Sequence, residues 1–181
     1  MEERPKWTSV STSYVQPRNS DEPDAWTEEA ARQGGAGASR ILDVAEVQPP
    51  TPIAESLRLR NDEKAVVRRR LVSLDGEPIE LADSYYPLPV AQGTPLAESR
   101  KIRGGAVTVL AGLGYHAHRV VEKVSCRPAN QREQEALRLN AGDWVLVLNR
   151  VVYARDETPF EVTVMTMVAD GRDLRYEMIA G

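Results

Sequence analysis

The sequence predicts an α+β domain, in which short helices flank a mostly antiparallel sheet of about six strands. Tight turns between strand-like runs predict the antiparallel pairing. Asp75-Gly76, a dipeptide that favours hairpin turns, separates two such runs, and the polar segment Asp156–Thr158 separates two more. Strands joined by hairpins, rather than by strand–helix–strand crossovers, argue against a doubly wound parallel sheet. At 181 residues the chain suits one domain with a substantial core.

The first 23 residues differ in composition from the rest of the chain. Met1–Pro23 are rich in Ser, Thr, Pro and charged residues and have no sustained apolar period, which predicts a flexible linker or arm. Trp7, Tyr14 and Val15 could attach this arm to a surface, such as that of a second subunit. The folded domain is predicted to span residues 24–181.

The helices are predicted from signals at their ends. Asp24 caps a short helix that ends at Gly34-Gly35, and Thr51-Pro52 begins a second one. Three further helix starts are Thr94-Pro95, Gly104-Gly105 before the apolar segment AVTVLAGLG, and Pro128–Asn130 before QREQEALRL.

The strands are predicted from alternating or continuous apolar runs. Asp143–Tyr153 is apolar on both faces and is therefore expected near the centre of the sheet. The other predicted strands are Ser39–Val47, the two hairpin strands within Val66–Pro87 (the second at Ile79–Tyr86), His116–Cys126, Pro159–Val168 and a short edge strand at Leu174–Ile179.

Composition restricts the class of protein. A net charge of −4 and a pI near 5.3 argue against this chain gripping a phosphate backbone by itself. A single cysteine, Cys126, excludes an intramolecular disulfide and favours a reducing compartment. No apolar run is long enough to span a bilayer, and the polar N-terminus is no signal peptide. These observations predict a cytoplasmic protein without membrane contact.

Signals for catalysis or metal binding are weak. The sequence lacks a Gly-x-Ser-x-Gly elbow and a phosphate-cradling glycine-rich loop. Cys126 has no activating neighbours and is expected to be a small buried hydrophobic residue. His116 and His118 share one face of a predicted strand, but no third ligand lies nearby. No catalytic residue, metal ligand or cofactor is therefore predicted.

Three consecutive arginines give the strongest chemical signal. Side chains alternate along a strand, so Arg68, Arg70 and Val72 share one face while Arg69 lies on the other. At least one arginine must therefore point to the buried side of the sheet or into a cavity. A buried guanidinium requires a carboxylate of the protein or an acidic ligand as its partner.

Glu161 is the matching carboxylate on the strand that follows Pro159. It shares a face with Thr163, Met165 and Met167, where an isolated carboxylate is costly. Arg70 and Glu161 can either form a structural salt bridge or flank a polar ligand. Composition alone favours the salt bridge.

The order of these pieces resembles the effector-binding (UTRA) domain of GntR-type regulators of the HutC subfamily. The resemblance covers roughly Asp24–Tyr176. It is carried by the arginine strand, the run DGEPIELADSYYP, the glycine-rich helix and the blocks HRVVEKVSCRPAN and ALRLNAGDWVLVLNRVVYARDETPFEV. It implies a fold similar to chorismate lyase, with a small-molecule pocket and a homodimer interface. It also implies a preceding winged helix-turn-helix domain that binds operator DNA, and that domain is absent from this chain.

The resemblance also implies which residues bind the effector. Arg70 and Glu161 match the family's ligand-contacting arginine and glutamate. Val72 and Ala82 stand where many members that sense sugar phosphates have an arginine and a glutamate, and Met167 replaces a frequent tyrosine. The predicted ligand-binding residues are Arg70, Glu161, Ser39 (placed in the first helix-to-strand loop), Arg68, Thr163, Met165, Met167, Val72, Ala82 and Gly105. A larger, more apolar effector with one acidic or hydroxyl group is therefore expected.

The function expected from the resemblance is a homodimerising sensor of a small molecule, without catalytic activity, that controls an attached DNA-binding domain. One alternative is a chorismate-lyase-like enzyme in which Arg70 holds a substrate carboxylate and Glu161 acts as acid or base. Another is a ligand-free dimerisation module with a collapsed pocket, in which Arg70 and Glu161 pair directly.

Overall fold

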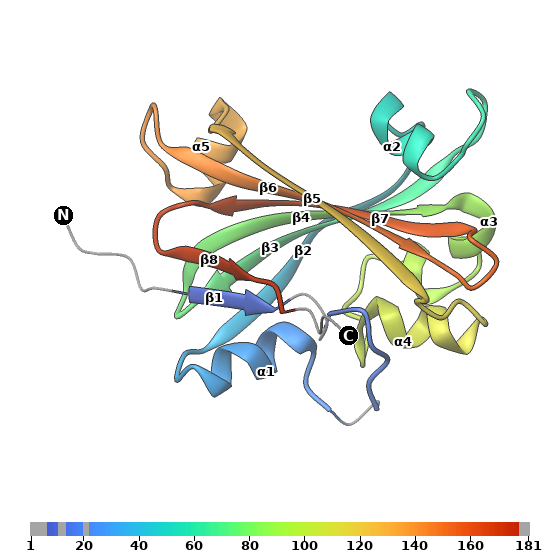
Figure 1. The fold of residues 1–181 in the computed structure, drawn as a ribbon, viewed down its shortest axis with the longest axis horizontal. Helices are drawn as coiled ribbons and strands as arrows, with labels where there is room; N and C mark the ends of the chain where they lie inside the picture. The colour runs from blue at the N-terminus through green and yellow to red at the C-terminus, as the bar shows by residue number, and fades with distance from the viewer. Residues whose placement is uncertain (1–6, 11–13, 20–21, 178–181) are drawn as a thin grey trace.

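The computed structural model describes residues 7–10, 14–19 and 22–177. A six-stranded sheet in the order β2-β3-β4-β7-β6-β5 forms its centre, and each neighbouring pair is antiparallel (Figure 1). Its strands are β2 (Gly37–Val47), β3 (Ala65–Leu74), β4 (Glu77–Pro87), β5 (Arg119–Pro128), β6 (Trp144–Tyr153) and β7 (Pro159–Val168). The predicted α+β class and antiparallel sheet are confirmed.

Two hairpins build most of this sheet. Asp75 and Gly76 adopt φ angles of 52° and 85°, the left-handed pair that a two-residue turn between twisted strands requires. β3 and β4 therefore pair from Ala65–Pro87 to Leu74–Glu77. The β6–β7 hairpin turns at Asp156 and Glu157, as the polar sequence there predicts.

Short helices cover both faces of the sheet. They are α1 (Ala25–Arg32), α2 (Thr51–Ser56), α3 (Leu88–Ala91), the 3₁₀ turn η2 (Pro95–Ala97), α4 (Gly105–Gly112) and α5 (Gln131–Leu137). Two of the predicted start signals act as expected, whereas Thr51 is the first residue of α2 and does not cap it: the N-cap is Pro50, without a side-chain hydrogen bond. Asp24 accepts the Thr27 amide at the start of α1, and Asn130 forms a capping box with Glu133 in α5. None of the helices among the described residues is long and apolar enough to cross a membrane.

The outer face of the sheet carries two apolar clusters. Ile53 and Leu57, in and just after α2, pack on Val67, Tyr85 and Val162. Leu137 of α5 packs in the same way on the part of this face formed by Leu81, Val145 and Val147. Burial of these side chains fixes the strand register, because a slip of one residue would reverse the two faces.

The inner face is covered differently. α1, α4 and a two-stranded ribbon of β1 (Trp7–Val10) and β8 (Arg172–Arg175) lie beneath it (Figure 1). Trp26 of α1 packs against Trp7, with ring centroids 4.9 Å apart, and α4 contributes Leu110 to a second cluster around Tyr86 and Phe160. The central part of this face carries polar side chains instead and is not filled by either cluster. A cavity lies there.

The ends of the chain differ from the predictions. Trp7–Val10 lie within the segment expected to be flexible, yet they form β1 and pair in parallel with β8. The predicted edge strand Leu174–Ile179 is found at Arg172–Arg175 and joins this ribbon rather than the main sheet; Ile179 lies outside the described residues. Both strands have four residues, too short for a clear periodic signal.

Two strand boundaries and the burial of one residue also differ from the predictions. β2 begins at Gly37, so Ser39 lies within a strand and not in a loop. β5 begins at Arg119, so His116 and His118 lie in the exposed segment before it and not on one face of a strand. Cys126 is exposed, contrary to the prediction that it is buried.

Candidate functional site

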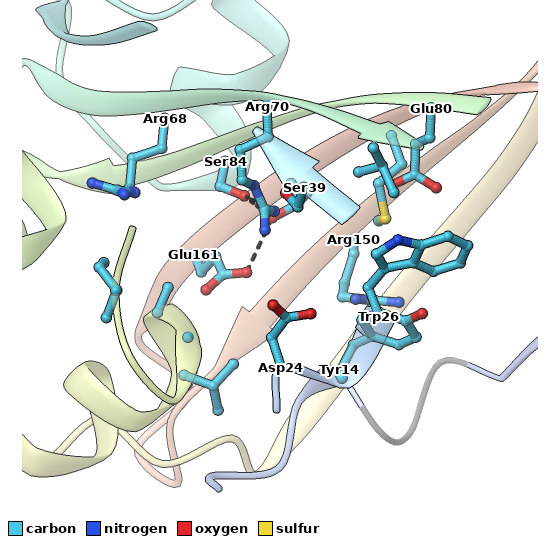
Figure 2. A pocket seen from close by; sticks show the side chains of 18 of the residues that line it. Tyr14, Asp24, Trp26, Ser39, Arg68, Arg70, Glu80, Ser84, Arg150 and Glu161 are labelled. Atoms are coloured by element: carbon cyan, nitrogen blue, oxygen red, sulfur yellow. Dashed lines mark hydrogen bonds between the residues drawn. The ribbon is translucent and has the colours of Figure 1, made fainter. Parts of the chain in front are cut away.

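A cavity of about 460 Å³ lies between the inner face of the sheet and the layer formed by α1, α4 and the N-terminal segment (Figure 2). Its walls come from β2, β3, β4, β6 and β7, and from residues of the covering layer such as Tyr14 and Trp26. This volume lies within the range of cavities that hold small molecules in proteins.

Arg70 and Glu161 point into this cavity from β3 and β7 (Figure 2). Both lie in the described part of the chain, and no ion pair within 4 Å joins them. Two hydroxyl groups connect them instead. Arg70 Nη2 donates to Ser84 Oγ at 3.3 Å, Ser84 Oγ lies 2.9 Å from Thr163 Oγ1, and Thr163 Oγ1 donates to Glu161 Oε1 at 3.0 Å.

This chain of hydroxyls orders the polar floor of the cavity. The single proton of Thr163 goes to Glu161, so Ser84 must donate its own proton to Thr163 and accept from Arg70. Ser84 is the one hydrogen-bond partner of the Arg70 guanidinium among the described residues. Arg70 therefore keeps most of its donors available to an acceptor inside the cavity.

Glu161 lines the cavity and is only partly exposed. Burial raises the pKa of its carboxyl group, and the hydrogen bond from Thr163 and the positive charges of Arg150 and Arg70 only partly oppose this rise. Burial likewise raises the pKa of the neighbouring Tyr86 hydroxyl, with a further contribution from Glu161. The site thus combines the Arg70 guanidinium with a carboxyl group whose pKa is raised by burial.

Arg68 lies two residues from Arg70 on the same face, but its guanidinium is largely occupied. It donates to four backbone carbonyl oxygens, those of Pro95, Leu96, Glu98 and Arg100, at 2.6 to 3.2 Å. The side chain holds the loop between η2 and α4 against the sheet. That loop leads to the wall formed by the start of α4.

The start of α4 needs glycine. Gly104 and Gly105 have φ angles of 72° and 79°, in the left-handed region, and both line the cavity. A Cβ atom at Gly104 would also lie 3.0 Å from Thr108 Oγ1. The positive φ of Gly105 explains why glycine stands at the opening of this helix, while its contact with a ligand stays a prediction.

The remainder of the cavity wall is mostly apolar. Leu148, Met165 and Met167 lie side by side on β6 and β7, while Val72 of β3 and Trp26 of α1 contribute from other sides. Methionine side chains are flexible and adapt to ligands of irregular shape. The wall can therefore accept an apolar group next to the polar floor.

A second polar group lies near β8. Arg172 Nη2 donates to Glu80 Oε2 at 2.9 Å, and both side chains are almost fully buried. Burial raises the pKa of Glu80, while the charges of Arg172, Arg70 and Arg150 oppose the rise. Arg150 in turn pairs with Glu122 at 2.6 Å and lies 5.8 Å from the ring centre of Tyr14.

Most residues predicted for the site line the cavity. They are Ser39, Arg68, Arg70, Val72, Gly105, Glu161, Thr163, Met165 and Met167. Ala82 does not line it. It lies opposite Arg70 and Met165 in the strand register and is 1% exposed, so these longer side chains cover it. That these residues contact a ligand stays a prediction.

The sequence did not identify Glu80, Arg150, Arg172 or Tyr14 as cavity residues. Glu80 and Arg150 could have been found from strand alternation. Glu80 lies on the same face of β4 as Ala82, and Arg150 lies on the inward face of β6. Arg172 is the first residue of the four-residue strand β8, which is too short for a periodic signal, and Tyr14 lies outside the strands of the sheet, so neither residue carries such a signal. In the part of the chain that the structure describes, no group of three or more His, Cys, Asp or Glu side chains is placed to hold a metal ion.

Comparison with known proteins gives a consistent result. The model of the UTRA domain family matches residues 32–171. The uncharacterized HTH-type transcriptional regulator SCO4628 of Streptomyces coelicolor is 28% identical over 124 residues, which are 67% of this chain and 46% of that protein. The chain therefore spans about half the length of the curated relative that it matches.

Solved structures show the same fold. A crystal structure of a protein assigned to the GntR family of transcriptional regulators has a TM-score of 0.84 at 23% identity, covering 99% of this chain and 72% of that one. The effector domain of PhnF from Mycobacterium smegmatis has a TM-score of 0.75 at 21% identity, covering 91% of this chain and 99% of that one.

Proposed function

Because the chain belongs to the UTRA domain family of GntR-family transcriptional regulators, we propose that its cavity binds a small-molecule effector through Arg70 and Glu161. The observation that carries this proposal is the Arg70 guanidinium. It faces the cavity, and its partner within the described residues is a neutral hydroxyl at 3.3 Å. A guanidinium in such a place is poised for an acidic or strongly accepting group of a ligand.

The effector is a molecule with one acidic or hydroxyl group and a substantial apolar part. Arg70 takes the acidic group, and the surface of Leu148, Met165 and Met167 takes the apolar part. Val72 lines the cavity in place of an arginine, which reduces the polar contacts that a sugar phosphate would need. The separation of Arg70 from Glu161 favours a ligand site over a collapsed dimerisation module, for which a direct ion pair is expected.

The regulatory step follows from population shift. Two copies of the chain form a homodimer, and the effector favours one arrangement of the subunits over another. The segment Met1–Pro23 transmits this preference to an attached winged helix-turn-helix domain. The effector can shift the equilibrium only by the ratio of its affinities for the two arrangements.

A thermal-shift screen tests the proposal. The library contains sugar phosphates, amino acids, fatty acids and aromatic acids. A ligand at about a hundred times its dissociation constant adds about 2.7 kcal/mol to the free energy of unfolding and raises Tm by several degrees. We expect Arg70→Ala to abolish the shift for the best ligand.

Arg69→Ala is the matched control, because Arg69 lies on the opposite face of β3 and pairs with Asp43 and Asp83. It should retain the ligand-induced shift. A screen without any stabilising compound, or a shift that survives Arg70→Ala, would count against the cavity as an effector site.

A further inference from the structure

Arg172 is a buried arginine that strand periodicity does not reveal. It lies in β8, where its backbone pairs with Trp7 of β1, and its side chain reaches the cavity. The side chain is only 6% exposed. A guanidinium at this depth is costly unless its donors meet acceptors.

The hydrogen bonds of Arg172 are incomplete. Nη2 donates to Glu80 Oε2 at 2.9 Å and lies 3.4 Å from the sulfur of Met167. Nε is buried without a hydrogen-bond partner, and Nη1 has none among the described residues. Nε is sealed from the cavity, but Nη1 is not among the buried atoms without a partner, so Nη1 is the donor that an acceptor in the cavity can reach.

The charge around Arg172 indicates which acceptor fits. Glu80 already balances the guanidinium, unlike the situation at Arg70, whose partner is a neutral hydroxyl. A second anion would therefore meet the Glu80 carboxylate at close range and be repelled. A ligand hydroxyl meets no such repulsion, because it can accept from Arg172 and donate to Glu80 at the same time.

The two polar groups belong to one cavity. Arg70 and Arg172 both line it, and Met165, Met167 and Leu148 provide apolar wall on the same sheet face. Met167 also touches Arg172 through its sulfur. A ligand that reaches both arginines therefore has polar groups at its two ends and an apolar middle.

We propose that Arg172 and Glu80 form a second binding subsite, which takes a hydroxyl group of a ligand whose acidic group is held by Arg70. The subsite rests on the proposed function, since it presumes that the cavity binds an effector. It assigns the effector to the class of hydroxylated apolar acids, with the hydroxyl remote from the acid group.

Calorimetric titration with two matched series of probes tests the subsite. One series runs from hexanoate to dodecanoate, and the other contains the ω-hydroxy acids of the same chain lengths. At the length that spans the two arginines, we expect the ω-hydroxy acid to bind the wild-type protein about tenfold more tightly than the unsubstituted acid.

The ratio of the two dissociation constants should fall to about one in Arg172→Gln. Because that change leaves Glu80 unpaired, the double variant Glu80→Gln with Arg172→Gln provides the second measurement and should show the same loss. Arg175→Gln is the matched control on β8. Its side chain is exposed and pairs with Glu177, and it should retain the tenfold ratio.

The outcomes separate the two proposals. If the unsubstituted acids bind and Arg70→Gln abolishes this binding, but the ω-hydroxyl adds no affinity at any length, the subsite is overturned and the effector site stands. A ratio that survives both Arg172 variants also overturns the subsite. If no acid of either series binds, the assignment to hydroxylated apolar acids fails, and the metabolite screen decides the effector site separately.

Discussion

At the scale of single residues, Arg68 and Arg70 carry the same side chain but have different roles, because they occupy different positions in the fold. Both point inward from β3, but the chain returns past Arg68 as η2 and the loop after it, whose carbonyl oxygens occupy its guanidinium. No such loop passes Arg70, so its donors face the cavity. Alternation determines the face on which each arginine lies, while tertiary contacts determine what it binds.

The Glu161 carboxyl group gives a pH-dependent prediction. Its folded-state pKa is raised above the ordinary value of 4.5, so the folded protein holds this proton more tightly than the unfolded chain. The resulting stability is fully present below pH 4.5 and is lost as the pH rises through the folded-state pKa. Glu161→Gln removes this loss and keeps an acceptor for Thr163.

We therefore expect Glu161→Gln and the wild-type protein to be equally stable near the unfolded-state pKa. The variant should become the more stable protein as the pH rises, by up to about 1.4 kcal/mol for each unit by which the pKa is raised. Urea unfolding at about pH 5 and about pH 8 measures the difference. A difference that stays constant between these conditions would contradict the assignment of a raised pKa.

The site could be predicted in part because every second side chain of a strand lies on the same face of the sheet. From Arg70 and Glu161, this rule extends to Thr163, Met165 and Met167. Arg172 is different, since it reaches the cavity only because β8 pairs with β1 from the other end of the chain. Periodicity carries no information on such a contact, and Ala82 shows the converse case of a correctly oriented residue hidden by its larger neighbours.

At the scale of elements, the loop between η2 and α4 depends on one side chain from β3. Arg68 is 4% exposed and binds carbonyl oxygens of Pro95, Leu96, Glu98 and Arg100. These bonds replace the regular backbone pairing that the loop lacks. The loop in turn leads to Gly104 and Gly105, which form part of the cavity wall.

Arg68→Met should therefore destabilise the protein by about 2–4 kcal/mol, because it leaves several carbonyl groups without a charged donor. It should also increase hydrogen exchange in residues 94–105 more than in the sheet. Arg69→Met is the control, since its ion pairs are on the outer face and partly exposed, and it should cost about 1 kcal/mol or less. Equal losses from the two variants would contradict the anchoring role of Arg68.

The main sheet was predictable at this scale, whereas the ribbon was not. Hairpins join strands that are close in sequence, and Asp75-Gly76 is a dipeptide that favours the two positive φ angles found in this turn. β1 and β8 pair in parallel although Trp7 and Arg172 lie at opposite ends of the chain. Such pairing depends on the surface that the rest of the fold offers, here Trp26 and Glu29 of α1.

At the scale of the whole molecule, the N-terminal segment is part of the cavity wall. Trp7 Nε1 and Ser9 Oγ donate to the Glu29 carboxylate, and Tyr14 lines the cavity beside Arg150. Trp7 also pairs with Arg172, which holds Glu80. A change in the position of β8 at the cavity would therefore alter its contacts with the N-terminal segment, which we propose to lead to a DNA-binding domain. By the same linkage, a change in the position of this segment would alter the affinity of the cavity for its effector.

Trp7→Ala tests this coupling. Trp7 is 5% exposed, packs on Trp26 and donates to Glu29, so its removal should release β1 from α1 and weaken its pairing with β8. We expect faster hydrogen exchange in β1 and β8, and an affinity for the effector found by thermal shift that is at least about fivefold lower. Global stability should fall by no more than about 2 kcal/mol, because a terminal ribbon can detach without unfolding the sheet.

Trp144→Ala is the control for this variant, since Trp144 is 54% exposed at the start of β6 and is not a residue of the ribbon. Its stability and effector affinity should stay close to those of the wild-type protein. If Trp7→Ala loosened the ribbon but bound the effector with unchanged affinity, the N-terminal segment would be a passive cover. Reduced affinity together with a loosened ribbon would instead show that effector binding is coupled to the docking of this segment. A ligand that binds less tightly to the protein with a detached ribbon must favour the protein with a docked ribbon by the same factor.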